Sequence, residues 1–296
     1  MDWKKLRIAV VAGDRREQEI ARQAAATGAE VRAYGFPWPA EGIAGVTHAP
    51  NAASALAGAD IALFPIPGIA PDGALFAPSC PERIIPDRAM LAAMRKPGHI
   101  ILGWADKNLK AHGEALGITF HEYEWDVGLM LMRGPAIVEG MLKVMIEHTD
   151  ITIHKSTVGI VGQGTIGTLV TRYMVALGAY THVFARNDVQ RAAAHAAGAE
   201  AHTLDELPDF VPRLDTVVST VPAQIVSRAI LERLPTHALL IDLAAPPGGI
   251  DRDAAQALGL KFVWARGMGM RAPITVGRSQ WGGIRKRIEA IYGGER

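Results

Sequence analysis

The second half of the chain carries a glycine-rich segment whose residue types and spacing suit phosphate binding. Gly162, Gly164 and Gly167 form a G-x-G-x-x-G pattern directly after the apolar run 157–161 and before a helical pattern at 165–177. The first glycine allows a tight turn, the second lets the backbone approach a pyrophosphate, and the third lets the helix pack closely on the strand. Free N–H groups at the helix start attract the anion. The alternative is a tight turn with only a structural role, but the strand–turn–helix order favours a dinucleotide site. Its residues are Gly162, Gln163, Gly164, Thr165, Ile166 and Gly167.

The next strand ends in residues that bear on the choice between NAD and NADP. The expected strand 181–185 is followed by Arg186 and Asn187, with no carboxylate until Asp188. An acidic residue there accepts hydrogen bonds from the ribose hydroxyls of NAD, whereas a guanidinium pairs with the 2′-phosphate of NADP. We therefore predict NADP as the cofactor; alternatively, Arg186 only stacks on adenine and NAD binds as well. Two later strand ends should border the nicotinamide ribose at the same edge, namely Thr220, Val221 and Pro222, and Asp242, Leu243 and Ala244.

The elements that must position these residues alternate between short β-branched runs and alanine-rich helical patterns. The chain has 296 residues and is 49% apolar, which is enough for two cores. Strand followed by helix, repeated along the chain, predicts an α/β fold of two Rossmann-like, doubly wound parallel-sheet domains with a cleft between them. The expected strands are 8–12, 30–34, 60–65, 99–103, 118–125, 157–161, 181–185, 216–220, 239–243 and 261–264, and the expected helices are 16–27, 165–177, 189–197, 225–234 and 279–291.

A helix that starts at Pro135 and continues through 137–148 is expected to connect the domains. Residues 1–133 are then a substrate or catalytic domain, on which a C-terminal helix within 278–296 packs back. Residues 134–277 are the nucleotide-binding domain. The proline-rich segment 64–86 is interpreted as a loop at the carboxyl edge of the first sheet, where ligands bind in open α/β sheets.

Composition excludes several classes of function. The 31 lysine and arginine residues balance 30 acidic residues, which argues against a broad nucleic-acid surface or a polybasic membrane patch. Cys80 is the only cysteine, so an internal disulfide and a cysteine metal cluster are ruled out. No apolar run approaches the roughly 20 residues of a membrane helix, and the run 8–12 is too short for a signal peptide. These features predict a cytoplasmic protein without a membrane partner.

A metal site is not expected from the sequence. Glu122, Glu124 and Asp126 alternate along a predicted strand and would share one face, which suggests a divalent ion. A solvated strand face is the favoured interpretation because no matching ligands lie nearby in the sequence. The ten histidines lack the H-E-x-x-H spacing of a zinc site.

Several segments, in order along almost the whole chain, resemble one family. They are Ile8–Arg16, His148–His154, Gly162–Gly167, Ala185-Arg186, Thr220-Val221-Pro222 and Asp242–Gly249. Together they resemble the dipicolinate synthase A-subunit family of spore-forming bacteria. Two segments depart from the family pattern: the run at 134–140 lacks its Pro-Thr-Ala-Glu-Gly sequence, and 265–277 loses two prolines and gains Arg266 and Arg271.

The resemblance implies a pyridine-nucleotide oxidoreductase built like the D-2-hydroxyacid dehydrogenases. It implies a small dicarboxylate substrate, a dihydrodipicolinate-type intermediate of the lysine pathway, which is converted to dipicolinate during sporulation. It also implies that a flavoprotein-like B subunit is the partner, and we expect a homo-oligomer. Two other functions stay open: a D-2-hydroxyacid or alanine-dehydrogenase-like oxidoreductase acting on another small acid, and a non-catalytic NADP-sensing subunit.

Such a substrate needs cations for its two carboxylates, and the planar guanidinium of arginine binds carboxylates bidentately. Arg15 follows the first strand at its ligand edge, and Arg271 lies in a glycine-rich loop expected to face the nicotinamide. The alternative for Arg15 is a solvated loop arginine. Thr275, which matches the family pattern after this loop, is assigned to the substrate with them.

The oxidation also needs a proton acceptor, and two carboxylates are candidates. Asp14 follows the first strand, and Glu139 lies near the start of the connecting helix. Glu139 is predicted to act as a base or to orient a water molecule. The alternative is that the negative charge of Glu139 only stabilises the start of the helix through the helix dipole. His148, near the far end of that helix, is better explained as a cap.

Overall fold

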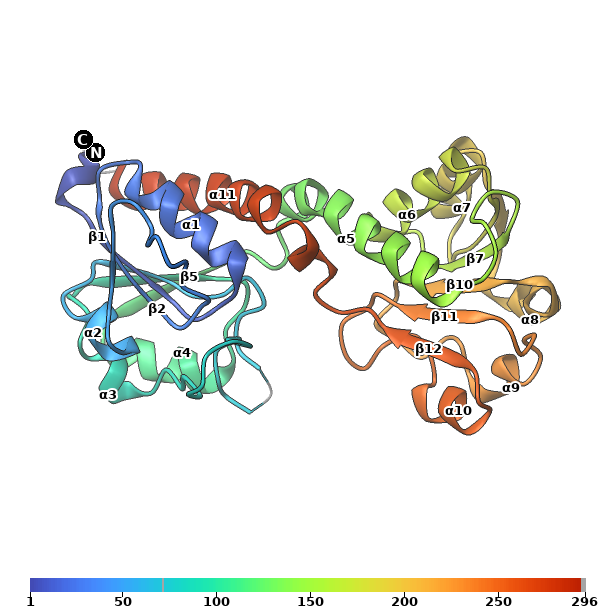
Figure 1. The fold of residues 1–296 in the computed structure, drawn as a ribbon, viewed down its shortest axis with the longest axis horizontal. Coiled ribbons are helices and arrows are strands. Elements are labelled where there is room, and N and C mark those ends of the chain that lie inside the picture. The colour runs from blue at the N-terminus through green and yellow to red at the C-terminus, as the bar shows by residue number, and fades with distance from the viewer. Residues whose placement is uncertain (71, 294–296) are drawn as a thin grey trace. The chain divides into compact units, whose positions relative to one another are not determined.

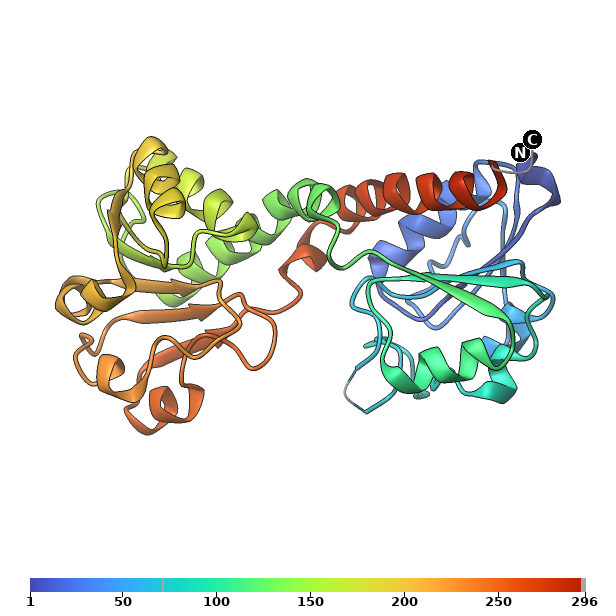
Figure 2. The ribbon, with the colours of Figure 1, turned by 180° about the vertical axis from the view of Figure 1, so that it is seen from behind.

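The computed structural model describes residues 1–70 and 72–293, which form two α/β units, each built on a six-stranded parallel sheet. Unit 1 contains residues 1–133 and the segment from Ala272 onward, and unit 2 contains 134–271 (Figures 1 and 2). The strand order is β3-β2-β1-β4-β5-β6 in unit 1 and β12-β11-β10-β7-β8-β9 in unit 2. Both are the doubly wound order of Rossmann folds, so the predicted fold class is confirmed.

Unit 1 has helices on both faces of its sheet: Figure 1 shows α1 and α11 on one face and α2, α3 and α4 on the other. The strands β1 and β4 are almost wholly buried, as parallel strands covered on both faces require. The strands are β1 Arg7–Val11, β2 Glu30–Tyr34, β3 Val46–His48, β4 Ile61–Leu63, β5 Gly98–Leu102 and β6 Ile118–Glu122. The helices are α1 Arg15–Ala25, α2 Ala52–Leu56, α3 Arg88–Leu91, α4 Lys107–Glu114, α11 Pro273–Gly293 and the 3₁₀ turn η1 Trp3–Lys5.

Unit 2 has a separate hydrophobic core on each face of its sheet. One core packs α5, α6 and α7 on the sheet, and the other packs α8, α9 and α10 on it. The strands are β7 Thr157–Val161, β8 Tyr180–Phe184, β9 Glu200–His202, β10 Thr216–Ser219, β11 Leu239–Asp242 and β12 Lys261–Trp264. The helices are α5 Val127–His148, which begins in unit 1, α6 Thr165–Ala176, α7 Asp188–Ala196, α8 Leu207–Phe210, α9 Arg228–Leu231 and α10 Arg252–Ala257. Three 3₁₀ turns complete it: η2 Leu204–Glu206, η3 Val211–Arg213 and η4 Met268–Arg271.

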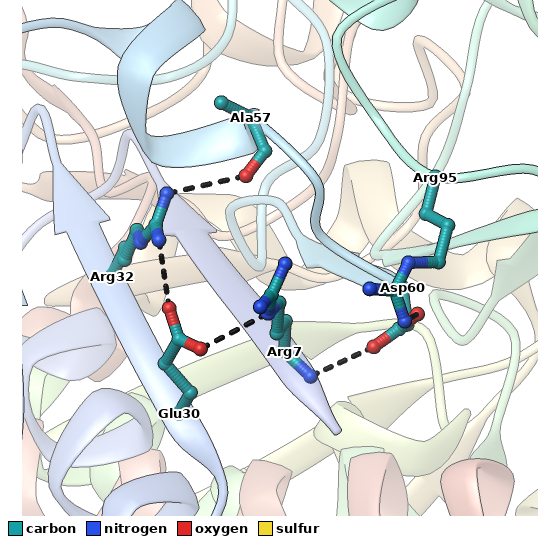
Figure 3. A network of polar contacts seen from close by, with 6 residues as sticks. All are labelled: Arg7, Glu30, Arg32, Ala57, Asp60 and Arg95. Atoms are coloured by element: carbon teal, nitrogen blue, oxygen red, sulfur yellow. Dashed lines mark hydrogen bonds and ion pairs between the residues drawn. The ribbon is translucent and has the colours of Figure 1, made fainter. Parts of the chain in front are cut away.

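The amino edge of each sheet is held by an aspartate that precedes the fourth strand of that unit along the chain, β4 in unit 1 and β10 in unit 2. In unit 1 the backbone N–H of Arg7 donates to Asp60 (2.8 Å), and the Arg7 guanidinium pairs with Glu30 (3.0 Å). Figure 3 shows this network with its further arginines. In unit 2 the backbone N–H of Thr157 donates in the same way to Asp215 (2.8 Å). The two units therefore share this backbone-to-aspartate hydrogen bond as well as their strand order.

The expected start of the connecting helix at Pro135 is wrong. The helix α5 begins at Val127, because the Asp126 carboxylate accepts a hydrogen bond from the N–H of Leu129 (3.1 Å) and starts the helix there. Pro135 therefore lies inside α5, where it has no N–H to donate to the carbonyl one turn earlier. The division between the units falls next to it, between Arg133 and Gly134.

Two other expectations about helices are corrected. The expected helix 225–234 shrinks to α9, because the N–H groups of Ile225 and Val226 both donate to the Gly249 carbonyl and keep the chain extended. The C-terminal helix starts at Pro273, a residue suited to a first helical position, rather than near 279. The last three residues of the expected segment 278–296 lie outside the described residues.

The strand expected at 118–125 ends at Glu122, so the three acids do not share a strand face. Each carboxylate instead has its own cation. Glu122 pairs with Lys110, Glu124 with Arg133 and Asp126 with Arg287. The 64–86 segment follows β4 at the carboxyl edge, and its described residues form no helix or strand beyond an isolated bridge. No helix among the described residues is long and apolar enough to cross a membrane.

Candidate nucleotide-binding site

The glycine-rich turn lies between β7 and α6, and its three glycines have three different surroundings. Gly162 has a φ of +98°, and a Cβ there would lie 2.4 Å from a Val221 methyl group. A Cβ on Gly167 would lie 2.2 Å from the Gly162 carbonyl oxygen, so only glycine permits this helix–turn approach. By contrast, beyond the adjoining residues, no atom in the described part of the chain lies within 4 Å of a Cβ built on Gly164. The turn is thus tight on its inner side and open at the middle glycine, as pyrophosphate binding requires.

No side chain among the described residues satisfies the first N–H groups at the amino end of α6. Gly164 is the N-cap residue and makes no side-chain capping bond. The first amides of a helix have no partner inside the helix and together carry a partial positive charge. The helix start is therefore free to bind an anion.

Neighbouring side chains fix this turn from behind. The Thr220 hydroxyl donates to the carbonyls of Val161 (3.2 Å) and Gly162 (3.3 Å). Gln163 is buried and accepts a hydrogen bond from the Thr171 hydroxyl (2.8 Å), while its amide nitrogen has no partner among the described residues. Thr220 and Gln163 thus hold the turn through their side chains and can meet a ligand through their backbone.

Arg186 is the cation that remains available at the end of β8. It is exposed, and no hydrogen bond or ion pair holds its guanidinium in the described part of the chain. The neighbouring Arg191 is already bound, because it donates to the Ala185 carbonyl (2.9 Å) and pairs with Asp188. Asn187 caps α7 by accepting a hydrogen bond from the N–H of Gln190 (2.9 Å). Of the three polar residues at this strand end, Arg186 is the one free for a 2′-phosphate.

The ends of β10 and β11 lie at the same carboxyl edge as the glycine turn, as the sequence predicted. Asp242 is 1% exposed, and its carboxylate accepts N–H bonds from Ala244, Gly249 and Ile250 at 2.7–3.1 Å. Burial raises the pKa of Asp242, although these three bonds act in the opposite direction. The Asp242 side chain therefore shapes the loop after β11, and a contact with the nucleotide would come from the exposed backbone of that loop.

The predicted substrate and proton-transfer residues are distributed over both units. Asp14, Arg15 and Thr275 belong to unit 1, where Arg15 and Thr275 are exposed and near the starts of the packed helices α1 and α11. Glu139 and Arg271 belong to unit 2 and form an ion pair with each other. Their predicted roles were separate, since Glu139 was expected to act on the proton and Arg271 on a substrate carboxylate.

Asp14 has a structural role that its sequence position did not reveal. It is 6% exposed, caps α1 and holds Arg16 through a bidentate ion pair (2.8 Å at the closest contact). In this arrangement the carboxylate has no free oxygen for a substrate, so the expectation that Asp14 acts as a base finds no support in its contacts.

Sequence reasoning missed a buried polar cluster behind Asp14. Glu17 is 2% exposed and accepts N–H bonds from Asp14 (2.7 Å) and Ile66 (3.0 Å). Burial raises the pKa of Glu17 to about 7; the Arg16 charge opposes this shift and the Asp14 charge adds to it. The Tyr123 hydroxyl is buried nearby without a partner among the described residues, and burial raises its pKa too. The capping-box spacing of Asp14 and Glu17 was the signal in the sequence that could have revealed this pair.

The two halves of the chain match two different family models. Residues 7–124 match the N-terminal domain of the dipicolinate synthase A subunit, and 139–255 match the NAD-binding domain of D-isomer specific 2-hydroxyacid dehydrogenases. The chain is 28% identical over 279 residues to the dipicolinate synthase A subunit of Bacillus subtilis (strain 168), which covers 92% of each. The chain is a relative of the dipicolinate synthase A subunit.

Solved structures agree with this relationship. The crystal structure of the dipicolinate synthase A subunit from Bacillus halodurans matches with a TM-score of 0.88 and 27% identity, over 97% of this chain and 99% of that one. The dipicolinate synthase A chain from Bacillus subtilis matches with a TM-score of 0.84 and 26% identity, over 98% of each. The kinship and the NAD-binding domain support an oxidoreductase role with a nicotinamide cofactor.

Proposed function

We propose that this chain is the dehydrogenase subunit of a dipicolinate synthase, which oxidises a dihydrodipicolinate-type dicarboxylate with NADP. The observation that carries the proposal is the combination of near full-length similarity to the dipicolinate synthase A subunit with an open glycine turn at the start of α6. The resemblance supplies the substrate class, and the turn supplies the capacity for a dinucleotide.

Aromatisation of a dihydropyridine dicarboxylate removes one hydride and one proton. Bound nicotinamide supplies the hydride acceptor. The backbone of Gly162–Gly167 would hold the pyrophosphate at the start of α6, Arg186 would pair with the 2′-phosphate, and the loop after β11 would border the nicotinamide ribose. The chain itself must then hold two carboxylates and accept one proton.

In this proposal Arg15 and Arg271 bind the two substrate carboxylates, and Thr275 assists them. Arg15 has no competing partner among the described residues, whereas Arg271 is paired with Glu139. A substrate carboxylate that takes the place of Glu139 on Arg271 releases the Glu139 carboxylate as the proton acceptor. Asp14 then positions the turn through Arg16 instead of accepting the proton.

The test is turnover by the purified chain. Chemically prepared dihydrodipicolinate is mixed with the protein and NADP or NAD, and dipicolinate and reduced nicotinamide are measured by their absorbance. We expect the two products in a one-to-one ratio, with NADP as the better oxidant. Turnover of a 2-hydroxy acid or of alanine in place of this substrate would contradict the proposal, as would NADP binding without turnover of any of them.

The partners are part of the proposal as well. We propose that the chain forms a homo-oligomer and works with a flavoprotein-like B subunit. Light scattering of the pure chain gives its mass in solution, and repeating the turnover assay with the B subunit present shows whether this second protein raises the rate. A monomer whose rate the B subunit leaves unchanged would contradict this part alone.

A further inference from the structure

Two histidines and a glutamate converge on the outer strands of the unit 2 sheet. His182 lies on β8, and Glu200 and His202 lie on the neighbouring edge strand β9, in register as His182 beside Glu200. The Nδ1 atom of His182 lies 3.1 Å from Nε2 of His202 and 3.4 Å from a Glu200 carboxylate oxygen. The same oxygen lies 4.0 Å from Nε2 of His202. It is the one group of at least three potential metal ligands found among the described residues.

These separations match the edges of a tetrahedral metal site. Zinc binds histidine nitrogen and carboxylate oxygen at roughly 2.0–2.2 Å, so two ligand atoms of a tetrahedron lie roughly 3.3–3.5 Å apart. Two of the three edges here, 3.1 and 3.4 Å, are close to this value without any movement. The third, 4.0 Å, involves Glu200, whose side chain is 72% exposed and can rotate to shorten it.

The surroundings hold the two imidazoles in place. The ring of His202 lies 4.1 Å from that of Phe210 and 5.1 Å from that of Phe184, centre to centre, and both histidine side chains are nearly buried. The carboxylate of Glu206 lies 3.9 Å from Nδ1 of His202, the nitrogen that faces away from His182. A carboxylate near the second nitrogen of a metal-binding histidine orients the ring and raises its basicity.

The charges around the cluster are negative on balance. Glu200 and Glu206 face it from β9 and η2. Two arginines act on the cluster from nearby: Arg213 acts on His182, with its guanidinium 4.6 Å from the centre of the Phe210 ring, and Arg191 acts on Glu206. Arg191 is itself paired with Asp188, so three carboxylates and two guanidinium groups surround the imidazoles, a balance that favours a cation.

We propose that His182, Glu200 and His202 form a binding site for a divalent transition-metal ion, with Zn²⁺ as the preferred occupant. Two imidazoles and one carboxylate are a ligand set that zinc accepts, with a fourth position for water. The ion would cross-link the edge strand β9 to β8, the strand whose end is followed by Arg186. Its role is therefore to stabilise the adenosine side of unit 2, and it takes no part in the hydride transfer.

Unit 1 provides a matched control for this site. His99 on β5 and His121 on β6 also lie on neighbouring outer strands, with their ring nitrogens 3.2 Å apart. They have no third ligand among the described residues, and the charge of Arg287 acts on His121. Two histidines at hydrogen-bond distance without a carboxylate should not hold a metal.

The experiment uses the full chain after treatment with a chelator. Zn²⁺ is titrated by calorimetry, and Co²⁺ is titrated by visible absorption, because tetrahedral Co²⁺ absorbs far more strongly than octahedral Co²⁺. We expect one equivalent of each ion to bind, a tetrahedral Co²⁺ spectrum, and a melting temperature of unit 2 that rises with Zn²⁺ concentration. The His182→Gln and His202→Gln variants should bind at least about tenfold more weakly, the smallest loss expected when even a supporting residue is removed.

Two further variants keep the test decisive. Glu200→Gln changes an exposed side chain, so it should fold normally and still lose affinity and the tetrahedral spectrum. His99→Gln should bind Zn²⁺ as the unchanged protein does. Absence of saturable binding in the unchanged protein would overturn the proposal. Folded Glu200→Gln and His202→Gln variants that bind Zn²⁺ as tightly as the unchanged protein would also overturn it. Neither result depends on dehydrogenase activity.

Discussion

The turns that follow β1 and β7 occupy equivalent positions in two sheets of the same strand order, yet their helix starts are satisfied in opposite ways. In unit 1 the start of α1 is closed by its own acids: Asp14 caps the helix and Glu17 accepts the N–H of Asp14. In unit 2 the start of α6 has Gly164 at its cap and no side-chain bond.

The difference shows that topology alone does not make an anion site. A carboxylate that satisfies the first amides of a helix occupies the place of a phosphate and repels it. In unit 1 a Cβ on Gly13 would lie 2.4 Å from Glu17, so the side chain fills that space. In unit 2 the space in front of Gly164 is open. The same fold therefore gives a nucleotide site in one unit and a self-capped scaffold in the other.

The largest expected effect follows from giving the open turn of unit 2 the acid that closes unit 1. Gly164→Asp should weaken nucleotide binding by more than about 100-fold, roughly 2.7 kcal/mol, because the carboxylate takes the space of the pyrophosphate. Folding should survive, since nothing lies within 4 Å of the new Cβ. Calorimetric titration with NADP measures the change. Gly164→Ala adds volume without charge and should weaken NADP binding less. Equal losses of affinity in the two variants would show that the charge is not the cause.

A second effect tests the closed turn of unit 1. The pKa of Glu17 is raised from 4.5 to about 7 in the folded protein. The folded state therefore binds the Glu17 proton more tightly than the unfolded state does. Its contribution to the free energy of unfolding is full below pH 4.5 and is lost as the pH rises through about 7, by up to roughly 1.4 kcal/mol per pH unit.

Urea unfolding of the wild type and of Glu17→Gln between pH 4 and 8 measures this contribution. We expect the stability difference between them to shrink with rising pH. Glu19→Gln in the same helix is the control: burial raises the pKa of Glu19, but bonds from Arg278, Gln23 and Arg22 lower it overall, so its contribution is lost toward acid pH instead. A difference for Glu17→Gln that is independent of pH would show that folding leaves the pKa of Glu17 unchanged.

The third effect compares the predicted substrate cations of the two units. Arg15→Ala and Arg271→Ala should each raise the substrate KM about 10- to 100-fold and leave the cofactor KM nearly unchanged, since each loses one charge-assisted contact worth roughly 1.5–3 kcal/mol. Arg15→Ala should cost more, because Arg271 must first leave Glu139. Steady-state kinetics decide it, and wild-type constants in both variants would place the substrate cations elsewhere.

The smallest effect concerns the strand that follows each turn. In unit 1, β2 ends at Tyr34 and is followed by Gly35, where a Cβ would lie 2.5 Å from an Ile84 methyl group, so the Ile84 side chain occupies the space beside this strand end. In unit 2, β8 is followed by the exposed Arg186. NADP should bind at least about tenfold more tightly than NAD, because only NADP gains a charge-assisted bond from Arg186 to its 2′-phosphate. Arg186→Asp should reverse this preference. Titration of both nucleotides tests this, and a mutant that still prefers NADP would exclude Arg186 as the residue that recognises the phosphate.

Local patterns were sufficient for much of the fold and for the nucleotide turn. The glycine triplet acts within six residues, and each glycine is required by the turn itself. Alternation of apolar strands with helices defined both sheets, because parallel strands must be buried on both faces. The helix start at Pro135 failed for a local reason too, because a capping aspartate at position 126 outweighed the proline.

Contacts between distant residues were decided only by the tertiary structure. Glu139 and Arg271 are neighbours in space although 132 positions separate them. The N–H of Ile66 likewise donates to Glu17, which lies 49 positions earlier in the chain. The His182, Glu200 and His202 cluster escaped sequence analysis because β9 has only three residues, too few for a periodic signal, and pairing with β8 creates the site. The sequence by itself determined where backbone amides would be free to bind a nucleotide. Which side chains would meet depended on strand pairing and helix packing, because those bring together residues whose spacing along the chain carries no pattern.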